Sequence, residues 1–155
     1  MVKDPKQVAK GKKNRASGGD FERRVRKDLE EKGWIVDKWS NNVEFNIIPD
    51  EEEIYIEGLL IPAKHKFRGP GIPMAMGTGF PDFIVFRFYR GFNGIKTYEI
   101  FGVEAKSNGY LTKEEKEKCR WLLDNHIFSK IKIANKTKIK NRIVIEYKEF
   151  KNEMA

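Results

Sequence analysis

The sequence predicts an α/β fold with a central mixed β-sheet flanked by helices. One observation is an apolar stripe with four-residue spacing, Phe21, Val25 and Leu29, which indicates an amphipathic helix over residues 20–32. Another is a capping box at Thr112 and Glu115, which opens a helix that runs to about Asn125. Alternating, β-branched segments bounded by turn residues indicate strands between and after these helices. A length of 155 residues corresponds to one domain with a sizeable core.

The composition is basic and favours a polyanionic partner. The chain has 31 Lys and Arg residues against 23 Asp and Glu residues, a formal net charge of +8. Nucleic acid is the first candidate, and a charge-rich surface of the thermophile type is the alternative. Cys119 is the single cysteine, which excludes an internal disulfide. Without a signal peptide or a long apolar segment, we expect a cytoplasmic protein with no membrane association.

Residues 1–19 are predicted to form a flexible basic arm ahead of a single domain at residues 20–155. The segment is rich in lysine and has almost no large apolar side chain. Lys12, Lys13 and Arg15 are candidates for phosphate contacts. A solvated tail without a ligand is the alternative interpretation.

The predicted helix over residues 20–32 carries a candidate acidic residue. Ser17 or Asp20 can cap its start, and Gly33 suits its end. Glu22 lies at the edge of the apolar stripe, where it could reach a functional site or only pair with Arg26 four residues later. The polar face also carries two candidates for phosphate contacts, Arg23 and Arg24.

The segment from residue 34 to residue 80 combines a first strand with an insertion. Residues 34–39 alternate as a strand that we expect to pair near the strand of Asp82. Ser40 follows it in a position that is typical of a turn residue. Residues 43–80 form the insertion: a hairpin over 43–60, then a long loop rich in glycine and proline. The basic cluster of that loop either grips DNA or is a solvated charge run: Lys64, Lys66 and Arg68.

Charged residues at the ends of two apolar runs form the candidate site. Asp82 opens the run at residues 83–86, and Glu104 and Lys106 follow the run at residues 100–103. An Asn-Gly turn at residues 93–94 predicts a hairpin that sets Asp82 beside residues 102–105. Glu104 and Lys106 are two residues apart and therefore share a face of the strand. Two carboxylates this close repel each other unless a divalent cation lies between them.

The C-terminal part completes the predicted sheet. Residues 127–133 and 142–147 are expected strands, with a basic turn over residues 136–140. The helix between residues 112 and 125 is expected to bury Cys119, Leu122, Leu123 and His126.

Pro81-Asp82 followed by Glu104-Ala105-Lys106 resembles the motif of the PD-(D/E)XK nuclease superfamily. Gly79-Phe80 before the motif and Gly109-Tyr110-Leu111 after it strengthen the resemblance. Residues 15–22 are similar to the opening of archaeal Holliday junction resolvases. The resemblance covers about residues 17–125 and implies a restriction-endonuclease-like core, with the 43–80 insertion as a departure from the compact resolvase pattern.

The resemblance implies a Mg²⁺- or Mn²⁺-dependent DNA endonuclease. Asp82, Glu104 and the Ala105 carbonyl would hold the metal, and Glu22 would contact a metal or a water. Lys106 would orient or deprotonate the attacking water and stabilise charge on the scissile phosphate. The expected catalytic residues are Glu22, Asp82, Glu104 and Lys106. The resemblance also implies that a lysine early in the helix after Thr112 faces the site, and the candidates are Lys113, Lys116 and Lys118. The expected activity is structure-selective hydrolysis of phosphodiester bonds in branched or duplex DNA by a homodimer, in recombination and repair, with no small-molecule cofactor. The insertion favours a more specialised nuclease of a virus or mobile element.

Two other functions remain open from the sequence. One is a non-catalytic nucleic-acid-binding module that has the nuclease-like fold, and the other is an enzyme or binder directed at RNA. All three functions need a surface that contacts the nucleic acid. The residues predicted to form it are Lys12, Lys13, Arg15, Arg23, Arg24, Ser40, Lys64, Lys66, Arg68 and Lys113.

Overall fold

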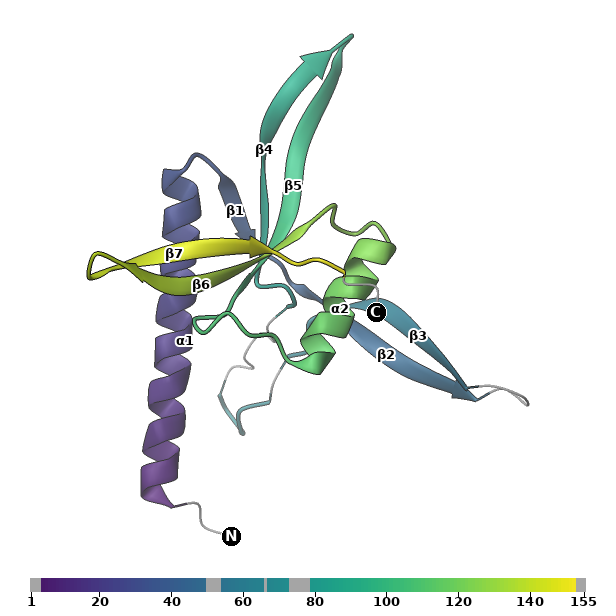
Figure 1. Cartoon of the computed structure of the whole chain (residues 1–155). Helices are drawn as coiled ribbons and strands as arrows, with labels where there is room; N and C mark the ends of the chain where they lie inside the picture. The colour runs from purple at the N-terminus through teal and green to yellow at the C-terminus, as the bar shows by residue number, and fades with distance from the viewer. Residues whose placement is uncertain (1–3, 50–53, 66, 73–78, 153–155) are drawn as a thin grey trace.

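The computed structural model describes residues 4–49, 54–65, 67–72 and 79–152. It confirms a mixed α/β architecture with a mixed central sheet and two helices (Figure 1). The elements in chain order are α1 (Pro5–Glu31), β1 (Ile35–Lys38), β2 (Asn41–Pro49), β3 (Ile54–Pro62), β4 (Phe83–Phe92), β5 (Ile95–Ala105), α2 (Lys113–Asp124), β6 (Ile131–Ile139) and β7 (Arg142–Glu149).

The central sheet has the strand order β1-β4-β5-β6-β7. β5 and β6 are parallel, and the other neighbours are antiparallel. A parallel pair needs a crossover connection, and α2 provides it between β5 and β6. Among the strands that the structure describes, β2 and β3 pair with each other and with no other strand, as the predicted inserted hairpin requires. The predicted first strand is confirmed as β1, which pairs with β4 directly after Asp82.

Two apolar clusters lie on opposite faces of the central sheet. On one face, Phe21, Val25 and Leu29 of α1 pack against alternate residues of β4 and β5, such as Val85 and Val103. The other cluster contains Cys119 and Leu122 of α2, Val43 of the inserted hairpin, and residues of the sheet. The strand alternation that places Val103 towards α1 directs the next residue, Glu104, away from that cluster.

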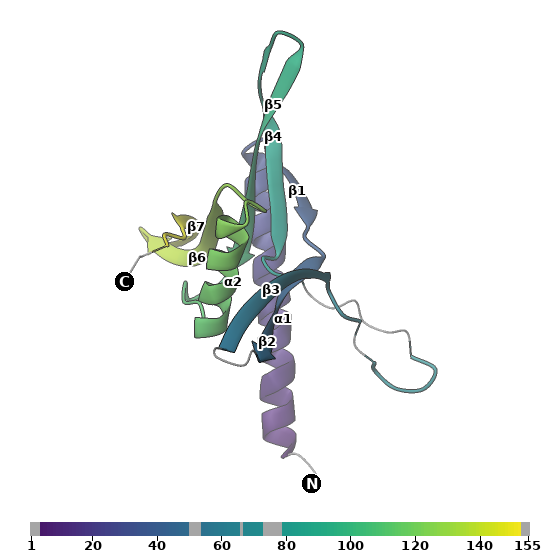
Figure 2. The same ribbon diagram turned by 90° about the vertical axis from the view of Figure 1, so that its right-hand side faces the viewer.

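Helix α1 begins at Pro5, so the prediction of a flexible arm is wrong for residues 5–19. The Asp4 side chain caps the helix and accepts a hydrogen bond from the Lys6 amide at 2.9 Å, and Pro5 occupies the first turn. Lysine, alanine, arginine and glutamine then favour the helix. The buried residues of α1 all lie in its second half, and its first half extends past the sheet (Figures 1 and 2).

The last two strands differ from the prediction in their limits. β6 begins at Ile131 and continues to Ile139, so the predicted turn over residues 136–140 shrinks to Lys140 and Asn141. Both turn residues have positive φ, 49° and 62°. His126 is exposed beyond the end of α2 with a φ of 57°, so its predicted place on the buried face of that helix is wrong.

No helix among the described residues is long and apolar enough to cross a membrane.

Candidate active site

The backbone around Asp82 is held by strands on both sides. Its carbonyl accepts a hydrogen bond from the Trp39 amide at 3.0 Å. Its amide donates to Oε2 of Glu104 at 3.1 Å. Pro81 packs directly over Gly102, where an added Cβ would come within 2.7 Å of the proline ring. These contacts fix the position of Asp82 at the start of β4.

The carboxylates of Asp82 and Glu104 lie side by side, as the sequence predicts. The register of the β4–β5 hairpin pairs Phe83 with Val103, which sets the preceding residue of β4 beside the following residue of β5. Oδ2 of Asp82 accepts a hydrogen bond from the Ala105 amide at 2.8 Å. Each carboxylate therefore binds a backbone amide of the opposite strand. The reciprocal pair orients both side chains at the same edge of the hairpin.

Both carboxyls of this pair hold a proton more tightly than usual. Burial raises the pKa of Asp82 to about 6, and the negative charge of Glu22 adds to the increase. Burial also raises the pKa of Glu104 well above its ordinary value, and the charge of Asp82 raises it further. Among the described residues, Glu104 is the charged residue whose side chain is buried. A cation bound between Asp82 and Glu104 would therefore offset the repulsion between their carboxylates and favour the charged form of both.

Lys106 stands beside the pair and is anchored by α2. Its Nζ lies 3.7 Å from Oε1 of Glu104 and 2.5 Å from Oε1 of Glu115. Burial alone would lower the pKa of Lys106, but the hydrogen bond that it donates to Glu115 and the charge of Glu104 raise it above its ordinary value. Lys106 is therefore a charged ammonium group held within reach of two carboxylates.

Glu115 is the site residue that the sequence reasoning missed. The capping box was predicted, and the Thr112 amide does donate to Oε2 of Glu115 at 2.8 Å. The capping box uses Oε2 of Glu115, and the other carboxylate oxygen, Oε1, accepts a hydrogen bond from Nζ of Lys106. Of the three lysines considered for this position, Lys113 and Lys116 are exposed and Lys118 pairs with Glu114 at 3.2 Å.

Glu22 lies near the pair but does not complete a three-residue cluster. It is half-buried on α1, and its charge contributes to the raised pKa of Asp82. In the described part of the chain, no group of three or more His, Cys, Asp or Glu side chains is placed to hold a metal ion. Two carboxylates with a backbone carbonyl nevertheless fit Mg²⁺, which commonly takes one or two carboxylates and completes its shell with water and phosphate oxygens.

Half of the predicted nucleic-acid contacts lie along α1. Lys12, Lys13 and Arg15 are exposed on the half of the helix that extends past the sheet. Arg23 and Arg24 are exposed on the following turns, and Arg23 forms an ion pair with Asp20. The basic residues thus follow one continuous helix instead of a flexible arm followed by a helix.

The other predicted contacts are scattered. The Ser40 carbonyl accepts a hydrogen bond from the Ala63 amide at 2.9 Å, so this residue closes the base of the inserted hairpin. Lys64 pairs with Glu44 at 3.0 Å, Arg68 is exposed in the loop, and Lys113 is the exposed first residue of α2. Lys66 and residues 73–78 of the predicted long loop lie outside the described residues.

Comparisons of the chain with protein-family models, with curated proteins and with solved structures found no match.

Proposed function

We propose that this protein is a metal-dependent DNA endonuclease with a restriction-endonuclease-like core, which hydrolyses phosphodiester bonds. The observation that carries the proposal is the adjacent pair of carboxyls, the half-buried Asp82 and the buried Glu104, with Lys106 beside them. Burying two adjacent carboxyls costs stability, and the fold gains no apolar packing from them. Clustered groups with strongly shifted pKa values are typical of functional sites.

In this proposal, Asp82, Glu104 and the carbonyl of Ala105 hold Mg²⁺ or Mn²⁺. When bound, such an ion lowers the pKa of a coordinated water and offsets the charge of the phosphate. The hydrogen bonds from the Ala105 and Asp82 amides keep the two carboxylates in place whether or not an ion is bound. The site therefore needs little rearrangement between its protonated and its charged form.

Lys106 and Glu22 act on the substrate side of the carboxyl pair. Because the pKa of Lys106 is raised, its ammonium stays charged at neutral pH and stabilises the negative charge that develops on the scissile phosphate. Glu22 accepts a proton from, or orients, the attacking water, and α1 holds it near Asp82. Glu115 keeps Lys106 charged and directed towards the site.

The substrate in this proposal is branched or duplex DNA, cut in the manner of a junction resolvase. Residues 5–19 of α1 carry five basic residues and no acidic residue: Lys6, Lys10, Lys12, Lys13 and Arg15. A helical segment of 15 residues is about 22 Å long, which spans roughly six base pairs of a duplex. This length and charge favour contact with a DNA backbone beyond the cleavage site.

The proposal is tested by cleavage of labelled DNA. The purified chain is incubated with a four-way junction, a matched duplex and a single strand, with Mg²⁺ or with EDTA, beside the Asp82→Ala variant. Paired symmetrical cuts in the junction, absent with EDTA and with Asp82→Ala, are expected. Cutting of duplex or single strand would retain the nuclease and reject the junction selectivity. Equal cutting by Asp82→Ala would reject the site.

A non-catalytic DNA-binding module is the second candidate, and one observation favours it. Glu115 engages the ammonium of Lys106 at 2.5 Å, closer than the carboxylate of Glu104. An ammonium committed to a neighbouring carboxylate could have a purely structural role. Tight DNA binding with no cleavage in any metal would support this function.

A further inference from the structure

The outer part of the β4–β5 hairpin is an exposed aromatic arm. We call residues 88–98 the β4–β5 arm. Four of its eleven residues are aromatic, against 12 % of the whole chain, and each is between 49 and 75 % exposed: Phe88, Tyr89, Phe92 and Tyr98. Figures 1 and 2 show the arm extending away from both helices. Isolated exposed rings are common, but a group of this density marks a binding surface.

The arm has no strand beside it in the described part of the chain. β1 pairs with β4 only as far as Phe86, and β6 pairs with β5 only from Gly102 onwards. The outer edges of both strands therefore present free backbone groups beyond these residues. Both edges and both faces of the arm are thus open to a ligand.

The charges of the arm are all positive. Its two charged residues are Arg90 and Lys96, and both are exposed. Glu99, the acidic residue that follows the arm, pairs with Arg87 at 3.8 Å and with Lys130 at 2.7 Å. The positive charges of the arm are therefore not neutralised by this neighbouring carboxylate. A surface of this kind attracts an anionic ligand.

The cations and the rings of the arm are interleaved. Tyr89 is the extra residue of the bulge between Phe88 and Arg90, and a bulge redirects the side chain that it carries. The guanidinium of Arg90 lies 5.4 Å from the centre of the Tyr89 ring, within the range of a cation–π contact. The rings of Phe88 and Tyr98 pack edge to face with centroids 5.9 Å apart. The arm therefore presents ordered rings next to an available guanidinium.

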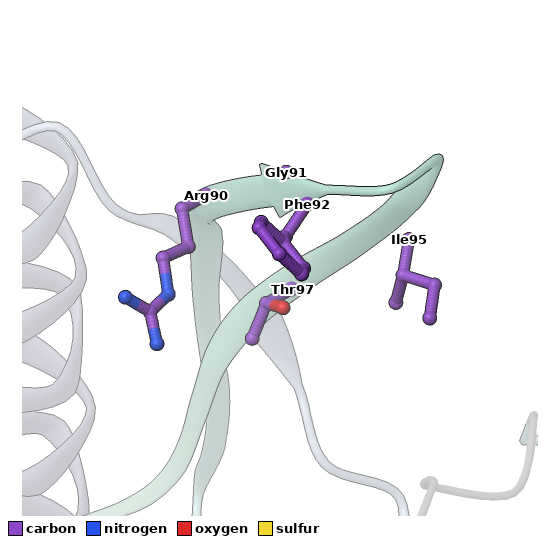
Figure 3. A pocket seen from close by; sticks show the side chains of 5 residues that line it. All are labelled: Arg90, Gly91, Phe92, Ile95 and Thr97. Carbon is purple, nitrogen blue, oxygen red and sulfur yellow. The ribbon is translucent and has the colours of Figure 1, made fainter.

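One face of the tip forms a hollow around Phe92. Arg90 pairs across the hairpin with Thr97, and Phe92 pairs with Ile95. Figure 3 shows these four side chains on the same side of the ribbon, where they line a hollow of about 470 Å³. Phe92 is 75 % exposed, so its ring is open to a flat ligand. The guanidinium of Arg90 and the hydroxyl of Thr97 supply hydrogen-bond donors beside that ring.

Rings beside cationic groups suit the bases of a single strand. Proteins that bind single-stranded nucleic acid combine basic side chains for the phosphates with aromatic rings on which the bases stack. In a duplex the faces of the bases are covered by their neighbours, and a base offers its face to a side chain only after it leaves the stack. The arm has rings for such faces, so unpaired bases fit it better than a duplex does.

The inserted β2–β3 hairpin shows the opposite composition. The charged residues of its strands are Glu44 and Glu57, which are both acidic. The large apolar side chains that the structure describes as exposed on it are aliphatic: Ile47, Ile48, Ile56, Leu59 and Leu60. Such a surface repels phosphates and offers no ring to a base. Of the two hairpins, the β4–β5 arm is the one whose chemistry matches a nucleic acid, and the other supplies a control.

We propose that the β4–β5 arm binds unpaired bases of DNA, which stack on Phe92 while Arg90 and Lys96 bind the adjacent phosphates. Nine steps along β4, at about 3.3 Å each, separate Phe83 from Phe92, so the tip lies roughly 30 Å from Asp82. The arm is therefore a DNA contact separate from the cleavage site. The choice of DNA as the ligand rests on the proposed function, but binding at the arm is measured in EDTA and needs no cleavage.

The first test compares two isoleucines with equal exposure on the two hairpins. Ile95 on the arm and Ile56 on β3 are each 70 % exposed, and a change to glutamate lowers the net charge equally at both. Fluorescence anisotropy measures the binding of a labelled single-stranded DNA in EDTA. Ile95→Glu should weaken binding by at least about tenfold, because its carboxylate lies beside the phosphates, whereas Ile56→Glu should stay within about twofold of the wild type. Unchanged circular dichroism of both variants separates lost binding from lost folding.

The second test separates stacking on bases from contact with phosphates. The competitor is an abasic strand of equal length, which has the phosphates and lacks the bases. The wild type and Phe92→Trp, which keeps a ring, should bind the strand with bases at least about fivefold more tightly than the abasic strand. Phe92→Leu keeps an apolar side chain without a ring, and it should bind the two strands alike.

Two results would overturn the proposal. One is equal binding of the two strands by the wild type. The other is an equal effect of Ile95→Glu and Ile56→Glu on the affinity for the single strand. Neither test measures cleavage, so a failure of the arm to bind bases is distinguishable from a failure of the nuclease.

Discussion

The two ends of the β4–β5 hairpin depart from ordinary burial in opposite ways: the base buries carboxyl groups, and the tip exposes apolar side chains. At its base, the carboxyl of Glu104 is buried and the neighbouring carboxyl of Asp82 is half-buried. At its tip, Phe92 and Ile95 are apolar groups placed in solvent. Buried charge and exposed apolar area are the two informative exceptions to ordinary burial. The base of the hairpin holds the carboxyls of the candidate site, and its tip holds exposed apolar side chains.

The largest expected effect contrasts packing at the base with packing at the tip. Phe101 is 1 % exposed and Phe92 is 75 % exposed. Phe101→Ala should lower the free energy of unfolding by about 3–5 kcal/mol, because it leaves a cavity between α1 and the sheet. Phe92→Ala should change it by less than about 0.5 kcal/mol, because this side chain is exposed. Urea unfolding measures the free energy of unfolding of both variants. A comparable loss in the two would contradict the difference in burial between Phe101 and Phe92.

The buried carboxyl at the base should destabilise the metal-free protein at neutral pH. The pKa of Asp82 rises from 3.8 to about 6 on folding, so the folded state retains a proton that the unfolded state has released. Stability is therefore highest below pH 4 with respect to this group, and it is lost as the pH rises through 6. This difference of about two pKa units corresponds to at most about 3 kcal/mol.

Asp82→Asn should remove this loss. Thermal unfolding in EDTA between pH 4 and pH 8 should give a flatter profile for Asp82→Asn than for the wild type, and a higher midpoint at neutral pH. The exposed Asp37 on β1 provides the matched control, since Asp37→Asn should leave the profile unchanged. If the unfolding midpoint of the wild type rises from pH 4 to pH 7 and that of Asp82→Asn does not, burial does not raise the pKa of Asp82.

A smaller effect is expected at Glu115. Glu115→Gln removes the charge that raises the pKa of Lys106 while retaining an oxygen for the hydrogen bond. Cleavage should fall about tenfold, and the alkaline limb of the pH–rate profile should move to lower pH. Glu114→Gln is the control, because Glu114 is exposed and pairs with Lys118. A loss of activity with an unchanged pH profile would indicate that Glu115 acts only as a helix cap.

The sequence predicted the part of the site that depends on local rules. The Asn93-Gly94 turn predicts the hairpin and brings Asp82 near residues 102–105, and the bulge between Phe88 and Arg90 then sets the pairing that places Asp82 opposite Glu104. The capping box likewise locates the start of α2. These features depend on residues within one hairpin or one helical turn, which is why they can be derived without a structure.

The features that the sequence did not reveal depend on longer contacts or on a balance of weak preferences. The partnership of Glu115 with Lys106 requires the loop between β5 and α2 to bring the helix start back to the sheet. The helical state of residues 5–19 depends on the Asp4 cap and on side-chain propensities, against three glycines that each cost up to about 1 kcal/mol. The exposure of the hairpin tip depends on where β1 and β6 end.

Calorimetric titration of Mn²⁺ tests whether Asp82 and Glu104 hold a metal ion. It is performed at neutral pH in the presence of a short duplex with uncleavable phosphorothioate linkages, which supplies the phosphate oxygens that Asp82 and Glu104 alone do not. We expect the wild type to bind Mn²⁺. This binding should be lost in both Asp82→Asn and Glu104→Gln, while both variants still bind the duplex. Equal Mn²⁺ binding by all three proteins, or none by the wild type, would contradict a metal site at the base of the hairpin.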